Sequence, residues 1–179
     1  PPVSTTDLTE VSAVAVGAHQ AHVNDGFFAK GQWCTACHVV PNGLYAPGHI
    51  DPAPAELTFG GLAVAQGATP SWEHDTATCS ETYCHGVTLS GGLHTAPIWT
   101  NEMGEANCGA CHGVPPPPPH VPNDGCYQCH PETISPSWQI NIETHVDGIL
   151  QVTLTCTSCH GAADSSDPAP PVGTGGETL

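Results

Sequence analysis

The segment Cys108–His130 reads CGACHGVPPPPPHVPNDGCYQCH, and its pattern recurs along the whole chain. Residues 108–112 and 126–130 are Cys-x-x-Cys-His units, and five consecutive prolines and His120 lie between them. Cys-x-x-Cys-His is the attachment signature of c-type haem, in which both thiols form thioethers and the imidazole binds the iron. One helical turn places both cysteines on one face with the histidine beside them. The segment therefore predicts two covalently bound haems.

All ten cysteines of the 179-residue chain fall into five such units. The units are Cys34, Cys37 and His38; Cys79, Cys84 and His85; Cys108, Cys111 and His112; Cys126, Cys129 and His130; and Cys156, Cys159 and His160. The second unit has four residues between its cysteines, which requires a bulged loop in place of one helical turn. A disulfide framework does not explain a histidine after every second cysteine, and zinc ribbons do not require that histidine either. We therefore predict five haem c groups and keep zinc as the weaker alternative.

Seven of the twelve histidines remain once the five proximal ones are assigned, enough to supply a second axial ligand to every iron. The predicted distal ligands are His19, His22, His49, His120 and His145. His74 and His94 are the spare candidates, and Met103 is interpreted as a gap-filling residue.

Context supports this choice of distal ligands. His19 and His22 lie three apart in a predicted helical turn at residues 18–22, which puts both on one side. The five prolines, at about 3.1 Å each in a polyproline helix, hold His120 roughly 15 Å from their start. This reach favours an iron other than the one bound by His112.

The composition predicts a mostly irregular fold. Glycine and proline account for 20 and 19 residues, and large apolar side chains are scarce. Such a chain buries too little apolar area to offset its ordering entropy, so a haem stack must replace the usual core. We predict one domain, residues 1–179, of irregular coil with short helices at the haem units and a few short strands. Residues 1–16 form an arm and residues 162–179 a Pro/Gly/Ser-rich tail.

Local patterns add finer expectations. Residues 56–64 predict a minor strand, and the period-two alternation in residues 140–154 predicts a hairpin that turns near Asp147 and Gly148. Residues 66–107 are expected to be rich in loops, with Trp72 and Trp99 packed against haem.

The charge balance is strongly acidic: Lys30 is the one lysine or arginine, against 17 acids, and the formal net charge is −16. Nucleic-acid binding is excluded because nothing is present to neutralise phosphates. The acids and the haem propionates make bound Ca²⁺ or a similar hard cation a candidate cofactor. The candidate ligands are Asp51, Glu73, Asp75 and Asp147.

No apolar run is long enough to span a membrane, so membrane insertion is not expected. Since c-type haem is attached outside the cytoplasm, the chain is expected to be exported. The simplest account is that Pro1 begins the mature chain after removal of a leader.

The ordered segments TCSETYCHG, PIWT, NCGACHGVPP, CYQCHPE and HVDG resemble the multihaem cytochromes of metal-respiring bacteria that pair a CxxxxCH unit with CxxCH units. The earlier segments GAHQAHV, CTACHVVP, GHID and ELTFG are similar to the part preceding that unit in the same family. The resemblance covers about residues 17–161. It implies extracytoplasmic electron transfer, often in extracellular respiration, and some related multihaem proteins polymerise into filaments. The near-absence of lysine and arginine departs from many of these cytochromes.

The predicted function is therefore an electron conduit and not an enzyme. The 179 residues divided among five haems leave about 36 residues per haem, so neighbouring porphyrins must lie close together. The sharper hypothesis is an extracellular or cell-surface polymer of identical subunits, with His19 or His22 donated to a neighbouring copy. Its partners would be other copies, redox proteins or extracellular acceptors. The alternatives are a monomeric periplasmic or surface carrier and, more remotely, a reductase, which would need an iron with an open coordination position.

Overall fold

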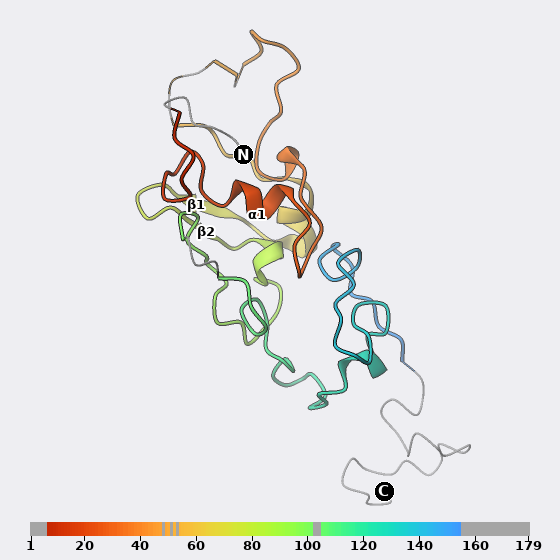
Figure 1. Ribbon diagram of the computed structural model, residues 1–179. Coiled ribbons are helices and arrows are strands. Elements are labelled where there is room, and N and C mark those ends of the chain that lie inside the picture. Colours follow the sequence, from red (N-terminus) through yellow and green to blue (C-terminus); the bar gives the residue numbers. More distant parts are fainter. Residues whose placement is uncertain (1–6, 48, 51, 53, 102–104, 155–179) are drawn as a thin grey trace, which may run out of the picture.

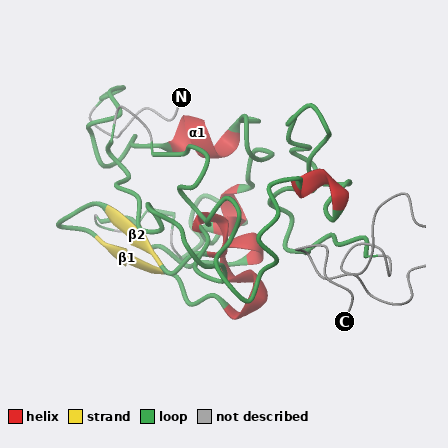
Figure 2. Ribbon diagram, turned by 90° about the horizontal axis from the view of Figure 1, so that it is seen from below, coloured by secondary structure: helices red, strands yellow, loops and turns green. Residues whose placement is uncertain are grey.

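The chain is largely irregular, as the composition predicts. The computed structural model describes residues 7–47, 49–50, 52, 54–101 and 105–154, and turns and loops dominate them (Figures 1 and 2). The helical elements are α1 (His19–Val23) and the short 3-10 helices η1 (Cys34–Ala36), η2 (Gly61–Gly67), η3 (Tyr83–His85) and η4 (Cys126–Gln128). Strands β1 (Ser71–Glu73) and β2 (Thr78–Ser80) form an antiparallel pair in which Trp72 lies opposite Cys79.

Three of the four described cysteine–histidine units contain a short helix. The first and fourth units close one helical turn, because His38 N donates to Cys34 O and His130 N donates to Cys126 O, both at 2.8 Å. The unit at residues 108–112 is a turn without a helix. In the CxxxxCH unit the chain leaves β2 and turns through Glu81, whose φ of 57° is left-handed. The bulged loop expected from the longer spacing is therefore present.

The strand predicted at residues 56–64 is wrong. The backbone of residues 58–60 bonds to the first haem unit, with Thr58 N donating to Cys37 O at 2.9 Å and Gly60 N to Ala36 O at 3.0 Å. Gly61 then takes a left-handed φ of 51° and η2 begins. The backbone N–H groups of Thr58 and Gly60 therefore bond a loop of the first haem unit and not a neighbouring strand.

The predicted hairpin at residues 140–154 is also wrong. Ile140 forms a single bridge with Ile134, and the following residues form a turn in which His145 N donates to Asn141 O at 2.9 Å. Ile142 and Thr144 fall in this turn, so their period-two spacing does not correspond to a pleat. The sheet lies instead within residues 66–107, which were expected to be loops.

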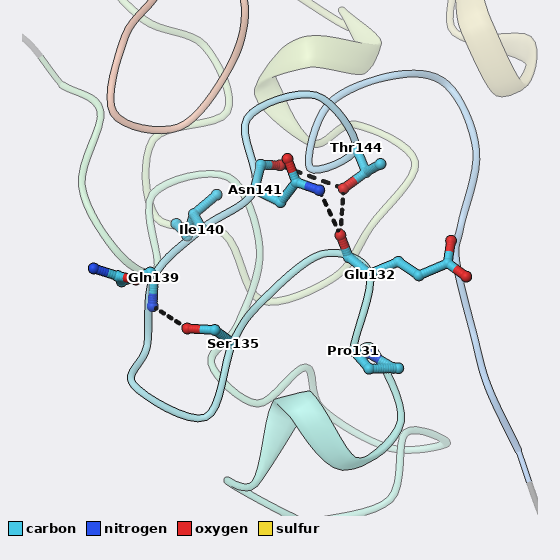
Figure 3. A pocket seen from close by; sticks show the side chains of 7 residues that line it. All are labelled: Pro131, Glu132, Ser135, Gln139, Ile140, Asn141 and Thr144. Carbon is cyan, nitrogen blue, oxygen red and sulfur yellow. Dashed lines mark hydrogen bonds between the residues drawn. The ribbon is translucent and has the colours of Figure 1, made fainter.

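The loop of residues 131–144, which precedes His145, is held together by hydrogen bonds between its own polar groups (Figure 3). Glu132 O accepts hydrogen bonds from Asn141 Nδ2 at 2.9 Å and from Thr144 Oγ1 at 2.6 Å. Gln139 N donates to Ser135 Oγ at 3.1 Å. These groups line a shallow hollow, and their bonds fix the loop from which the His145 side chain extends.

Side chains make almost no apolar core in the described part of the chain. The buried apolar residues are Val16 and four alanines, while Tyr45 and Trp33 are 89% and 85% exposed. Thr82 is buried and its hydroxyl has no hydrogen-bond partner. Among the described residues, no helix has the length and apolar character needed to cross a membrane. Exposure of so many large apolar side chains normally indicates a binding site for another group or another molecule.

Candidate metal centres

Four histidines of the cysteine–histidine units each face another histidine. We number these pairs as sites 1 to 4 in the order of their proximal histidines. Site 1 is His38 with His19, site 2 is His85 with His22, site 3 is His112 with His145, and site 4 is His130 with His120. The ring centroids are 6.3, 6.0, 6.2 and 6.3 Å apart in that order.

These separations match the space for one metal ion between two imidazoles. A first-row metal binds an imidazole nitrogen at about 2.0–2.1 Å, and the ring centre lies about 1.1 Å behind that nitrogen. Two imidazoles on opposite sides of one iron therefore have centroids about 6.3 Å apart. The ring planes are nearly parallel at sites 1, 2 and 4, with angles of 16°, 20° and 16°, and are turned by 62° at site 3. The residues of all four sites fit axial ligation.

Backbone carbonyls set the protonation of seven of these eight rings. The Nδ1 acceptors are Val16 O for His19, Ala18 O for His22, Glu56 O for His38, Gly113 O for His112, Val121 O for His120, Gln151 O for His130 and Phe28 O for His145. A carbonyl only accepts, so Nδ1 carries the proton and Nε2 keeps its lone pair. A histidine bound to a metal commonly donates its other N–H in this way, which fixes the ring orientation.

Burial also favours the neutral rings that bind metals. Burial lowers the pKa of His85 to about 4, and repulsion from His22 adds to this effect. Burial likewise lowers the pKa of His19 and of His145. These imidazoles are therefore neutral at pH 7, the form in which histidine binds iron.

The described cysteines belong to the units that supply the proximal histidines. None of the eight described cysteines is in a disulfide. Burial, together with the proximity of Cys37, raises the pKa of Cys79 and of Cys84 to about 11. Cys84 is also close enough to Cys111 to influence it. Cysteines of the first, second and third units thus lie near one another, which places sites 1 to 3 side by side.

The backbones of sites 2 and 3 are in direct contact. A Cβ at Gly86, next to His85, would lie 1.8 Å from Cys111 O, so only glycine permits this approach. His94 N donates to Ala110 O at 2.8 Å, and Gly113 N donates to Ser90 O at 2.8 Å. The segment following the second unit therefore lies along the third unit.

Three other predicted or spare ligands have no facing imidazole among the described residues. His49 is exposed, and its Nδ1 bonds Leu44 O at 2.9 Å, the same kind of anchor that the distal histidines of sites 1 to 4 use. His74 and His94 are exposed. The choice of His49 as a distal ligand therefore finds no partner iron site within the described part of this chain.

The fifth cysteine–histidine unit lies outside the described residues. Its two predicted haem-attaching cysteines are Cys156 and Cys159, and its predicted proximal ligand is His160. The structure therefore places four of the five predicted units, and the fifth stays a prediction from the sequence. The predicted roles of Met103 and Asp51 also concern residues outside the described part of the chain.

Two expectations about the distal ligands need correction. One of His19 and His22 was expected to reach a neighbouring copy, but each of them faces a proximal histidine of its own chain. The proline run does not extend as one uniform spacer either. It turns at its end, where His120 N donates to Pro117 O at 3.2 Å. Even so, His120 faces His130, which belongs to a unit other than that of His112.

Clusters for other metals do not form in the described part of the chain. No group of three or more His, Cys, Asp or Glu residues is arranged to hold a metal ion there. Asp147 accepts hydrogen bonds from Ile149 N at 2.8 Å and Gln151 Nε2 at 2.7 Å. Glu73 accepts one from Asp75 N at 3.3 Å.

Sequence reasoning missed the groups that orient the imidazoles. Their carbonyl acceptors are backbone atoms, so no residue type marks them, and the Phe28 carbonyl lies 117 residues from His145 in the chain. Lys30 also ties this loop to the turn before His145, at 3.0 Å from Glu143 and 3.3 Å from Asp25. Lys30 is the one lysine or arginine in the sequence, and this was the one feature that could have drawn attention to the ion pairs.

Residues 78–112 match a protein family described as the Geobacter CxxxxCH...CXXCH motif. The match spans the second and third haem units, which supply the proximal histidines of sites 2 and 3. This segment carries multihaem c-type cytochrome motifs, which imply covalently attached haem and an extracytoplasmic location. No curated protein and no solved structure matches the chain.

Proposed function

We propose that this protein is an extracytoplasmic pentahaem c-type cytochrome that carries electrons along closely spaced haems with two histidine ligands each. The observation that carries the proposal is the set of four imidazole pairs, each with a proximal histidine and centroids 6.0–6.3 Å apart. The cysteines of each unit would hold the porphyrin, and the paired histidines would hold the iron. The haem supplies one-electron redox chemistry when bound.

The chain's own residues would set the environment of each iron. Backbone carbonyls accept from Nδ1 of these imidazoles and leave Nε2 as the atom that would bind the metal, and burial keeps His85, His19 and His145 neutral. The two histidines of each pair would occupy both axial positions of a bound haem, which favours electron transfer over catalysis. The scarcity of buried apolar side chains also supports the proposal, because porphyrins would cover the apolar surface in place of a side-chain core.

The decisive experiment counts haems and axial ligands on the purified protein. Intact-mass spectrometry should show five covalent haems, and the ferric protein should be entirely low-spin, with the near-infrared charge-transfer band of bis-histidine ligation. Fewer than five haems, or a high-spin iron at sites 1 to 4, would contradict the proposal. A high-spin signal together with substrate turnover would favour a reductase instead.

We further propose that the protein assembles into an extracellular or cell-surface polymer, with His49 as the ligand offered to an iron of a neighbouring copy. His49 has an anchored Nδ1 and an exposed ring, and Ile50 beside it is 64% exposed. Tyr45 in the same loop is 89% exposed. The loop therefore offers apolar surface together with a ligand, as an interface between subunits requires.

The position of this loop supports a head-to-tail contact. Residues 39–47 extend at one end of the molecule, beyond α1 (Figure 1). The last described residues lie toward the other end, where Thr153 N donates to Cys129 O at 2.8 Å beside site 4. A contact between opposite ends is head-to-tail, and it produces an open filament when the rotation between copies does not close into a ring.

Electron micrographs of native material and of a His49→Ala variant test the polymer. The native protein should form filaments, and the variant should remain monomeric with one iron lacking a histidine ligand. His74→Ala is the matched control and should assemble normally. Isolated wild-type monomers with five fully ligated irons would leave a monomeric periplasmic or surface carrier as the function. Metal analysis after dialysis against a chelator would show whether Ca²⁺ contributes to assembly.

A further inference from the structure

Trp99 contacts the distal imidazoles of two different sites. Its ring centroid lies 4.8 Å from that of His19, with the planes at 82°, and 5.4 Å from that of His22, with the planes at 38°. His19 belongs to site 1 and His22 to site 2. One indole thus packs against the ligands of two neighbouring centres.

Both the backbone and the side chain of Trp99 are anchored. Its backbone N donates to Ala77 O at 2.7 Å, beside the bridge between Thr78 and Ile98, so the indole projects from the edge of β2. Its Nε1 donates to Val14 O at 2.8 Å, in the turn that leads to α1. The indole therefore connects the sheet to the segment that carries both distal histidines.

Gly17 allows the indole to lie directly on that segment. A Cβ at Gly17 would fall 1.8 Å from Trp99 Nε1, and the φ of Gly17 is +43°. Any side chain at this position would displace the indole as well as strain the backbone. The close approach of Gly17 and Trp99 is thus specific to this pair of residues.

We propose that Trp99 is a positioning residue that sets the orientation of the axial imidazoles at sites 1 and 2 together. This inference rests on the proposed function, because it concerns haem ligands. α1 has five residues, and a helix of this length is not stable without tertiary contacts. The indole supplies that contact and keeps His19 and His22 nearly parallel to their partners, at 16° and 20°. A change at Trp99 should therefore alter two centres and leave sites 3 and 4 as they are.

The test compares holoproteins with Trp99→Leu and Trp99→Phe by electron paramagnetic resonance and redox titration. In ferric haem with two imidazoles, parallel rings give a rhombic signal, and rings turned toward perpendicular give a strongly anisotropic one. Trp99→Leu should convert two of the rhombic signals to anisotropic ones and shift two midpoint potentials. Trp99→Phe keeps a ring against the imidazoles but loses the Nε1 donor, so a smaller shift of the same two signals is expected. Trp138→Phe, at an exposed tryptophan, is the control.

Gly17→Ala tests the same contact from the other side. Gly17→Ala should shift the same two signals. If Trp99→Leu does not accumulate as a haem-loaded protein, Gly17→Ala and Trp99→Phe together still test the positioning role. Unchanged signals in Gly17→Ala and Trp99→Phe, or equal changes at all four sites, would overturn the positioning role. If the wild-type protein lacks low-spin bis-histidine signals altogether, the proposed function fails first, so the two failures are distinguishable.

Discussion

The distal histidines of sites 1 and 2 stand on one helix, whereas those of sites 3 and 4 come from two separate loops. α1 carries both His19 and His22, and Trp99 packs against both rings. His120 follows the proline run, and His145 ends the turn that Glu132 closes. A shared element makes two centres dependent on one local structure, while separate loops allow each centre to be changed alone.

The two regions also differ in how far their anchors reach. His19 and His22 bond carbonyls of Val16 and Ala18, which belong to the same turn. His145 bonds Phe28 O from a distant part of the chain, and Lys30 beside it pairs with Glu143. Site 3 therefore depends on the docking of two loops, and its ring angle of 62° is the one that departs from parallel.

Breaking α1 should have the largest effect. Proline in Val23→Pro removes the amide hydrogen that the last turn of α1 requires and clashes with the carbonyl of His19 four residues earlier, at a cost of about 3 kcal/mol in a helix interior. Sites 1 and 2 should lose their distal ligands together, which would be visible as two high-spin irons in the absorption and resonance spectra. Val23→Ala keeps the helix and should leave both sites low-spin. Loss of ligation at one site alone would show that the two histidines are held independently.

Removing one loop ligand should affect one centre. His145→Ala should make site 3 high-spin and abolish the single strongly anisotropic ferric signal, because site 3 has the turned rings. The rhombic signals of sites 1, 2 and 4 should remain. His94→Ala, at an exposed histidine without a facing ring among the described residues, should leave the spectrum unchanged. An anisotropic signal that survives His145→Ala would contradict the assignment of site 3.

Replacing prolines in the run before His120 should weaken axial ligation at site 4 only partly. Replacing Pro116 and Pro117 by alanine increases the conformational freedom of the unfolded chain, and each substitution should cost about 0.4–1 kcal/mol. We expect a high-spin fraction at site 4 that grows on heating, measured by absorption against temperature. The same double substitution at Pro52 and Pro54, outside the four sites, is the control and should not change this fraction.

The smallest effect is expected at Lys30. Lys30→Gln removes the ion pairs with Asp25 and Glu143, which are exposed and screened by salt. A slight fall in the thermal midpoint at low ionic strength, absent at high salt, should result, with the ferric signal of site 3 broadened. Glu10→Gln changes the net charge by one unit in the opposite direction without touching these pairs, so it shows the size of the general charge effect. A loss of site 3 ligation would show that the ion pairs hold the loops more strongly than exposed pairs normally do.

The irregular fold and the helical turn of the CxxCH units could be predicted from the sequence. The strands expected at residues 56–64 and 140–154 were wrong. The motif spacing fixes local covalent chemistry, so one helical turn at His38 and at His130 followed directly. Residues 56–64 and 140–154 have strand-like alternation, yet neither has a partner strand among the described residues. Their backbone groups bond the first unit and Asn141 instead. Short apolar patterns do not specify a partner, and in a chain with few buried side chains the local bonds decide.

By itself, the sequence determined which residues can hold haem, because cysteine spacing and the adjacent histidine are properties of consecutive residues. It also determined that the chain has enough histidines to give each iron a second axial ligand. Tertiary structure alone decided that His19 faces His38, His22 faces His85, His145 faces His112 and His120 faces His130. Those pairings depend on how α1, the proline run and the Asn141 turn are placed in space. Their anchors are backbone carbonyls, which every residue type possesses and no sequence pattern distinguishes.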